Sequence, residues 1–249
     1  MEYSIAKHRL LLILESIAIF LVMLALLTII GLQLFGYSGL LLSAGGVIFI
    51  VIVANRKMAY VQPQNVTKLS EDQVPGMYES IRELAKRANL ENIPELYLFN
   101  AQYMNAATLD KPGKPMIIVT PPVVNQLSDR EVTALLAHEV AHIQSRDVLF
   151  QRIIQAVHLL TQIVAQTAWI MLILFFPIFL FSRANFPLYI LVILFGAPVL
   201  SVLLQLAFSR SREFNADLGA VELTGDPLAL ADALEKIEKV QHRFLDTML

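Results

Sequence analysis

Residues 128–142 read SDREVTALLAHEVAH, and this stretch determines how the rest of the chain is interpreted. Ser128 and Glu131 stand three apart before a run of apolar residues at helical spacing. That pattern is typical of a capping box and predicts a helix that begins at Asp129. On this helix His138 and His142 are four residues apart, so their imidazoles project from one face, one turn above the other. This is the spacing that two ligands of one zinc ion require.

Glu139 adds a carboxylate beside this histidine pair. It is rotated by about 100° from His138 around the helix, so it can lean over the open coordination position of a tetrahedral zinc ion. There it can act as the general base that activates zinc-bound water for attack on a peptide carbonyl. The alternative is an exposed helix face that carries two histidines by chance, which the scarcity of histidine disfavours, since the chain has only 5. The motif predicts a zinc metalloendopeptidase with one zinc ion per chain.

A catalytic zinc ion needs a third protein ligand, and in this class of site it is His or Glu. Residues 211–217 read SREFNAD, in which Glu213 and Asp217 are again four apart. One of these carboxylates can bind zinc while the other accepts the free N–H of a ligating histidine. The chain contains no cysteine, which excludes disulfides, thiolate ligands and a cysteine nucleophile.

The composition indicates a membrane protein, because 56% of the residues are hydrophobic and only 16% are charged. About 20 apolar residues cross a bilayer as a helix. Four apolar runs meet or approach that length: Leu10–Phe35, Tyr37–Ala54, Ile153–Phe181 and Phe186–Phe208. Four buried helices of a soluble protein are disfavoured, because such helices would show polar faces at helical period. The predicted fold class is an α-helical membrane protein with four transmembrane helices.

The basic residues that flank these runs predict the orientation. Those on one side are Lys7, Arg9, Arg56, Lys57, Arg146, Arg152, Arg210 and Arg212. Only Arg183, in the loop Ser182–Asn185, falls on the other side. We therefore expect a multi-pass protein of the plasma (inner) membrane, with both termini and the active site in the cytosol.

This topology divides the chain into four parts. Residues 1–54 form an N-terminal transmembrane hairpin, and 55–152 form a cytosolic catalytic segment that contains the histidine pair. Residues 153–208 form a second hairpin, and 209–249 form a cytosolic segment that carries the third zinc ligand and completes the catalytic domain. A hairpin of spans brings the two sets of ligands together.

The segment 55–152 is the polar part of the chain and reads as alternating α and β elements, which predicts an α+β domain. Val74–Ala88 has apolar residues at helical spacing after an early proline. Glu95–Phe99 and Met116–Thr120 are short apolar runs bounded by turn residues, which predicts strands. Met104–Leu109 is a possible third, edge strand.

Taken together, these motifs resemble the HtpX family of membrane metallopeptidases. The resemblance rests on two N-terminal spans, the HEVAH motif after LSDREV (residues 127–132), two further spans, and SREFNAD. It implies a gluzincin fold, zinc, and proteolytic quality control of misfolded or damaged membrane proteins under stress. By the same match, His138, His142 and Glu213 would be zinc ligands, Glu139 the catalytic base, and Asp217 the partner of a ligand imidazole.

The stretch Asn105, Ala106, Ala107 and Thr108 resembles the Asn-Ala edge-strand motif of that family, which lies near the substrate cleft. The spacing after Asn105 departs from the family pattern. The expected partners are the lipid bilayer, unfolded or membrane-protein substrates, and other components of membrane quality control.

Two other functions remain open at this point. A prenyl-protein (CAAX-type) endopeptidase shares the HExxH motif and a downstream carboxylate, but such enzymes usually have more spans. A catalytically silent membrane adaptor would have no need to keep Glu139 beside two ligands. Nucleic-acid binding is not expected, because acids and bases nearly balance at a net charge of -2.

Overall fold

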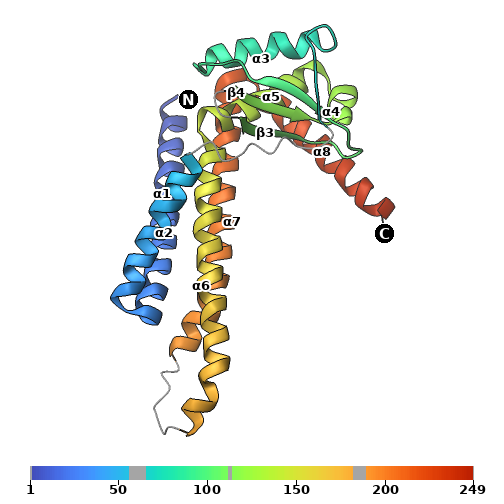
Figure 1. Cartoon of the computed structure of the whole chain (residues 1–249). Helices are drawn as coiled ribbons and strands as arrows, with labels where there is room; N and C mark the ends of the chain where they lie inside the picture. The colour runs from blue at the N-terminus through green and yellow to red at the C-terminus, as the bar shows by residue number, and fades with distance from the viewer. Residues whose placement is uncertain (1, 56–65, 112–113, 182–188, 249) are drawn as a thin grey trace. The chain divides into compact units, whose positions relative to one another are not determined.

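The structure is a computed structural model that describes residues 2–55, 66–111, 114–181 and 189–248 (Figure 1). It divides into two compact units. The first unit comprises Met1–Arg9, Ala59–Leu149 and Arg212–Leu249, and the second comprises Leu10–Met58 and Phe150–Ser211. Each unit is built from segments that lie far apart in the sequence.

The second unit is formed by long helices. They are α1 (Glu2–Phe35), α2 (Tyr37–Asn55), α6 (Asp147–Phe181) and α7 (Tyr189–Thr224), of which α1, α6 and α7 also extend into the first unit. The turn between α1 and α2 passes through Gly36 at a φ of 58°. A Cβ atom on Gly39 would lie 1.8 Å from the carbonyl oxygen of Gly31, so only glycine permits this close approach of the two helices.

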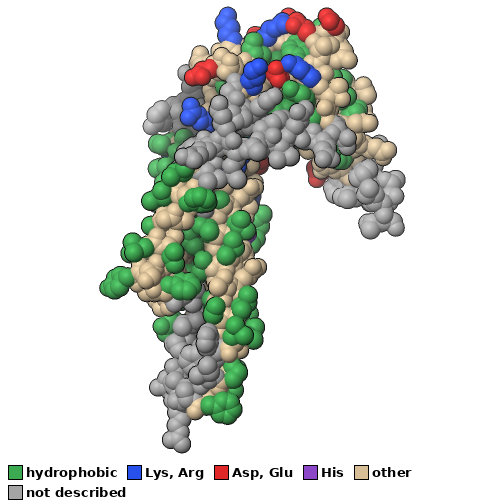
Figure 2. Space-filling view, viewed as in Figure 1, with side chains coloured by type: hydrophobic (Ala, Val, Ile, Leu, Met, Phe, Trp, Pro, Cys, Tyr) green, Lys and Arg blue, Asp and Glu red, His purple; other side chains and the backbone are tan. Residues whose placement is uncertain are grey.

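Three of the described helices contain segments long and apolar enough to cross a membrane: Leu10–Gln33, Asp147–Leu174 and Leu191–Thr224. Helix α2 holds a shorter apolar stretch, Tyr37–Phe49. The visible surface of the helical unit carries mainly hydrophobic side chains, and charged side chains gather over the first unit (Figure 2). The chain is therefore a multi-pass membrane protein, and the count of four spans stays a prediction. The predicted loop Ser182–Asn185 lies outside the described residues.

The first unit contains a four-stranded sheet with the strand order β1-β2-β4-β3. Strand β2 (Glu95–Phe99) pairs in antiparallel fashion with β1 (Val66–Lys68) and in parallel with β4 (Lys114–Val119). Strand β3 (Ala106–Lys111) pairs with β4 and forms one edge of the sheet. The prediction of Glu95–Phe99 is confirmed. Strand β4 begins two residues earlier than the predicted Met116–Thr120, and β3 begins two residues later than the predicted Met104–Leu109. The short β1, which is mostly exposed, was not predicted.

The first unit also contains four helices that belong to it alone: α3 (Pro75–Arg87), α4 (Pro121–Gln126), α5 (Asp129–Gln144) and α8 (Pro227–Met248). The predicted start of α5 is confirmed, because Ser128 and Glu131 form a capping box. Helix α5 contacts α3, α8 and strands β3 and β4. Because neighbours surround α5 on several sides, polar residues of this helix are buried along with the apolar ones, among them Glu131, His138 and Glu139.

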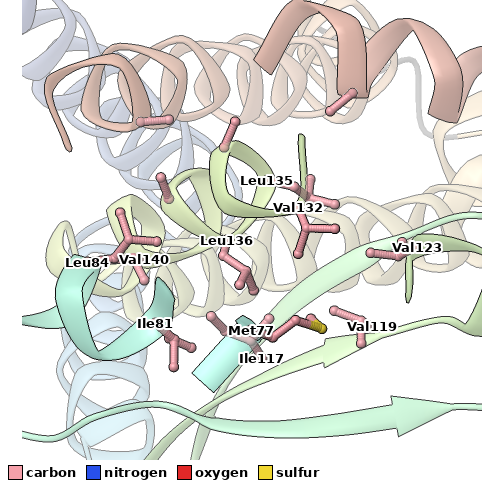
Figure 3. Packing of buried hydrophobic residues seen from close by; sticks show 14 of the residues in the cluster. Met77, Ile81, Leu84, Ile117, Val119, Val123, Val132, Leu135, Leu136 and Val140 are labelled. Carbon is pink, nitrogen blue, oxygen red and sulfur yellow. The ribbon is translucent and has the colours of Figure 1, made fainter. Parts of the chain in front are cut away.

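The core of the first unit is shared by α3, β4 and α5 (Figure 3). Ile81 of α3 and Ile117 of β4 are fully buried, and Leu136 of α5 packs with them. Truncation of such a side chain, for instance Leu136→Ala, costs about 2–5 kcal/mol. This packing fixes α5, and with it the face that carries the two histidines.

Candidate metal centre

His138 and His142 of α5 and Glu213 of α7 meet in the first unit. The Nε2 atoms of the two histidines are 3.1 Å apart. The Oε2 atom of Glu213 lies 3.4 Å from Nε2 of His138 and 3.8 Å from Nε2 of His142. The two histidines are largely buried, and the Glu213 side chain is about half exposed.

These separations fit a zinc ion. Two ligand atoms at about 2.0–2.1 Å from one tetrahedral zinc ion lie about 3.3–3.4 Å from each other. The three observed separations, 3.1, 3.4 and 3.8 Å, bracket that value. Two imidazoles and one carboxylate are also a donor set that zinc prefers. Among the described residues these are the side chains that could hold a metal ion together.

The other nitrogen of His138 faces Asp217. Its Nδ1 atom lies 3.0 Å from Oδ1 of Asp217, which is an ion-pair distance, although the atoms are not aligned for a hydrogen bond. Burial by itself would lower the pKa of His138, but the carboxylates of Asp217 and Glu213 outweigh it and raise the pKa to about 9. Asp217 is thus located where it can orient this imidazole.

His142 has a carboxylate partner of its own that the sequence did not reveal. Its Nδ1 atom lies 2.7 Å from Oδ2 of Asp147, the first residue of α6. Burial lowers the pKa of His142, whereas Asp147 and Glu213 raise it, and the net result is a pKa of about 10. Asp147 in turn pairs with Arg212. The signal that could have indicated Asp147 is an acidic residue five positions after the second histidine, which is uninformative without the geometry of the turn between α5 and α6.

Glu139 is buried and contacts the edge strand of the sheet. The hydroxyl of Thr108 in β3 lies 2.7 Å from Oε2 of Glu139 and 3.1 Å from its backbone oxygen. A hydroxyl donates one hydrogen at a time, and the shorter contact is to the carboxylate. Thr108 was expected only as part of an edge strand, and the structure also gives it a direct contact with the predicted base.

The rest of the predicted edge-strand motif lies at the start of β3. Ala106, Ala107 and Thr108 pair with β4, and Asn105 precedes the strand. The backbone N–H of Asn105 donates to the hydroxyl of Thr120, and the backbone oxygen of Asn105 accepts from the N–H of Thr120. These bonds fix the residue that precedes β3. A cavity of about 470 Å³ lies beside this edge. Its lining includes Thr108, Leu109, His142, Ile143 and Leu149.

A pair of histidines, a glutamate beside them and a carboxylate from a distant helix form the arrangement typical of HExxH metallopeptidase sites, here in a chain with long apolar helices. The family model described as peptidase family M48 matches residues 73–247. The chain belongs to peptidase family M48.

Two curated relatives, both described as "Protease HtpX homolog", have similar sequences. The one from Nostoc punctiforme is 36% identical over 193 residues, covering 73% of this chain and 62% of that protein. The one from Burkholderia multivorans is 34% identical over 224 residues, covering 86% and 75%. The chain thus spans less than two thirds of the length of the Nostoc relative. A crystal structure of S. mikatae Ste24p aligns at a TM-score of 0.47 and 21% identity, covering 90% of this chain and 55% of that chain, a likeness too distant to carry an argument.

Proposed function

We propose that this chain is a membrane-bound zinc endopeptidase that cleaves unfolded or exposed segments of membrane proteins. The observation that carries the proposal is the set of three ligand atoms spaced for one zinc ion, with Glu139 next to His138 on the same helix. Membership of a peptidase family and relatives described as HtpX proteases support the activity and the quality-control role. His138, His142 and Glu213 would hold the ion.

The chemistry divides between the ion and the side chains. A zinc ion held by these residues supplies Lewis-acid chemistry, which polarises a peptide carbonyl and lowers the pKa of water toward about 7. Glu139 is the base that takes a proton from the attacking water and hands it to the departing amine nitrogen. Thr108 donates a hydrogen bond to Oε2 of Glu139 and so orients the carboxylate that takes the proton.

The substrate would bind along the outer edge of β3. Among the described strands β3 is the last in the sheet, so none of them pairs with its outer side, where an extended peptide could add as a further strand. An extended peptide that pairs with Ala106, Ala107 and Thr108 would pass Glu139, and its side chains would enter the cavity beside Leu109. This mode requires an unfolded segment, which agrees with a role in the removal of misfolded proteins.

The localisation belongs to the same proposal. Three apolar helices and the HtpX relatives support a multi-pass protein of the inner membrane. From the distribution of basic residues we infer that the active site and both termini are cytosolic. The predicted second span, Tyr37–Ala54, and the pairing of Ile153–Phe181 with Phe186–Phe208 as a second hairpin are part of this inference.

The test is cleavage of casein, a loosely folded protein, by the purified full-length chain in detergent. The wild-type protein should copurify with one zinc ion per chain and lose activity to a chelator. Glu139→Gln keeps the shape of the side chain but cannot accept the proton, so it should retain zinc and lose activity by several orders of magnitude. His138→Ala should lose the zinc ion itself. Cleavage by Glu139→Gln at near the wild-type rate would refute the mechanism, and zinc binding without cleavage in the wild type would favour a silent adaptor.

A further inference from the structure

Asp147 is a buried acid to which the proposed chemistry assigns no role. The residue is 1% exposed and begins helix α6, at the corner that follows α5. Its two carboxylate oxygens have different partners. Oδ2 lies 2.7 Å from Nδ1 of His142, and Oδ1 accepts from the guanidinium of Arg212.

Arg212 connects this corner to the third proposed ligand. It immediately precedes Glu213 on α7 and is 7% exposed. Besides Asp147 it contacts the backbone oxygen of Ser145 at 3.4 Å. Asn215, three residues further along α7, donates from Nδ2 to Oγ of Ser145 at 3.0 Å. The turn of α7 that carries Glu213 is thereby tied to the corner between α5 and α6.

The energetics of burial make this pair informative. Removal of one partner of a buried ion pair costs about 3–5 kcal/mol, whereas well-packed apolar side chains in place of both are often neutral or stabilising. Stability alone therefore does not explain two buried charges at this place. The two charges do fix the orientation of side chains. The planar guanidinium and the carboxylate hold each other in one geometry, and the carboxylate fixes the orientation of the His142 ring.

We propose that Asp147 and Arg212 are positioning residues that hold His142 and the Glu213 turn in the metal-binding arrangement. The proposal rests on the proposed zinc site. Asp147 accepts the Nδ1 hydrogen of His142 and so directs Nε2 toward the ion. Arg212 balances the buried carboxylate and places the following residue, Glu213, opposite the histidines.

The experiment separates positioning from stability by exchanging both members of the pair. In the full-length protein, Asp147→Leu/Arg212→Met removes both charges, and Asp147→Asn/Arg212→Met keeps an acceptor for His142. Zinc affinity is measured by competition with a chromogenic chelator, and stability by thermal unfolding of the metal-free protein. We expect both double variants to unfold near the wild-type temperature. We expect the zinc affinity of Asp147→Leu/Arg212→Met to be about 10–100-fold lower than that of the wild type. The zinc affinity of Asp147→Asn/Arg212→Met should be at least about tenfold higher than that of the Leu-containing variant.

Two further measurements sharpen the result. The d–d absorption of the Co²⁺-loaded protein reports ligand geometry and should change in the Leu variant at saturating Co²⁺. The matched control is the exposed pair of Arg82 with Glu71, which contacts none of the proposed ligands, and Glu71→Leu/Arg82→Met should leave zinc affinity unchanged.

The failure of this proposal differs from the failure of the proposed function. If the wild-type chain does not bind zinc in the same assay, the metal site is wrong. If the wild type binds zinc and both double variants bind it equally well, the site stands and the positioning role is refuted. The positioning role is also refuted if zinc affinity falls only in those variants whose unfolding temperature falls, and in proportion to that fall.

Discussion

At the scale of single residues, Glu213 and Asp217 approach different nitrogen atoms of the His138 ring. Glu213 lies 3.4 Å from Nε2, and Asp217 lies 3.0 Å from Nδ1. We therefore predict that Glu213→Gln nearly abolishes zinc retention through purification. Asp217→Asn should weaken the site by about 10–100-fold, so that added zinc refills it. Metal analysis of both purified variants decides the assignment, and full zinc occupancy in Glu213→Gln with loss in Asp217→Asn would reverse it.

The raised pKa values of the two histidines predict how the site responds to pH. In the metal-free protein the pKa is about 9 for His138 and about 10 for His142, against an ordinary value of 6.5. Raised values stabilise the metal-free fold below pH 6.5, and this stabilisation is lost as the pH rises through 9 to 10. Zinc needs neutral imidazoles, so its binding releases protons and its affinity increases between pH 6.5 and 9.

The difference in unfolding temperature between zinc-saturated and metal-free protein should therefore grow from pH 6.5 to 9. Calorimetric titration of zinc in buffers of different ionisation enthalpy should show proton release at pH 7. A zinc affinity that does not vary over this range would contradict the prediction.

The contact between Thr108 and Glu139 gives a second prediction about catalysis. A hydrogen bond to a charged group contributes about 1.5–3 kcal/mol. Thr108→Val keeps the shape of the strand residue but leaves Oε2 of Glu139 without this donor. We expect kcat/KM to fall by about 10–100-fold while zinc content stays at the wild-type level. Thr67→Val, in the exposed strand β1 of the same sheet, is the matched control and should have wild-type kinetics. Equal effects of the two variants would show that the contact has no role in catalysis.

At the scale of elements, the distance between α5 and α7 depends on a glycine. A Cβ atom on Gly219 would lie 2.6 Å from Cβ of Ala141, which precedes His142. Gly219→Ala must therefore push the two ligand-bearing helices apart. We predict that zinc affinity falls by about tenfold or more, because ligand atoms tolerate errors of only about 0.2 Å.

The compensating exchange tests this cause directly. Ala141→Gly in the Gly219→Ala background moves the methyl group from one helix to the other, so zinc affinity should return toward the wild-type value. Gly76→Ala in α3, where the added Cβ meets no atom within 4 Å, should leave zinc affinity unchanged. If the exchange fails to restore zinc binding, the loss does not come from the spacing of these helices.

Patterns along the chain predicted those elements whose structure is determined by residues close together in the sequence. The capping box at Ser128 gave the start of α5, and a local apolar run gave β2. The same patterns missed β1, because three mostly exposed residues acquire strand geometry only by pairing with β2. For the site, spacing by four predicted two pairs of neighbours on helices. The contacts of Asp147 with Arg212 and of Thr108 with Glu139 join residues 65 and 31 positions apart, which no local period indicates.

At the scale of the whole molecule, the proposed orientation can be tested with introduced cysteines, because the chain has none of its own. Ser70 lies in the segment proposed to be cytosolic and is exposed, and Ser182 lies in the loop proposed to be outside. In intact cells an impermeant maleimide should label the Ser182→Cys protein, and it should label the Ser70→Cys protein only after lysis. Labelling of Ser70→Cys but not Ser182→Cys in intact cells would overturn the orientation, and with it the cytosolic active site.

The division of the metal ligands between α5 and α7 also sets an order of events during synthesis. His138 and His142 leave the ribosome early, but Glu213 follows only after the whole of α6 and most of α7 have been made. Until then the nascent chain holds two of the three donors that gather in the finished fold. On the proposed function, the three-donor metal site is therefore incomplete until Glu213 has been made, so the nascent chain is expected to lack the activity while its own segments are still unfolded.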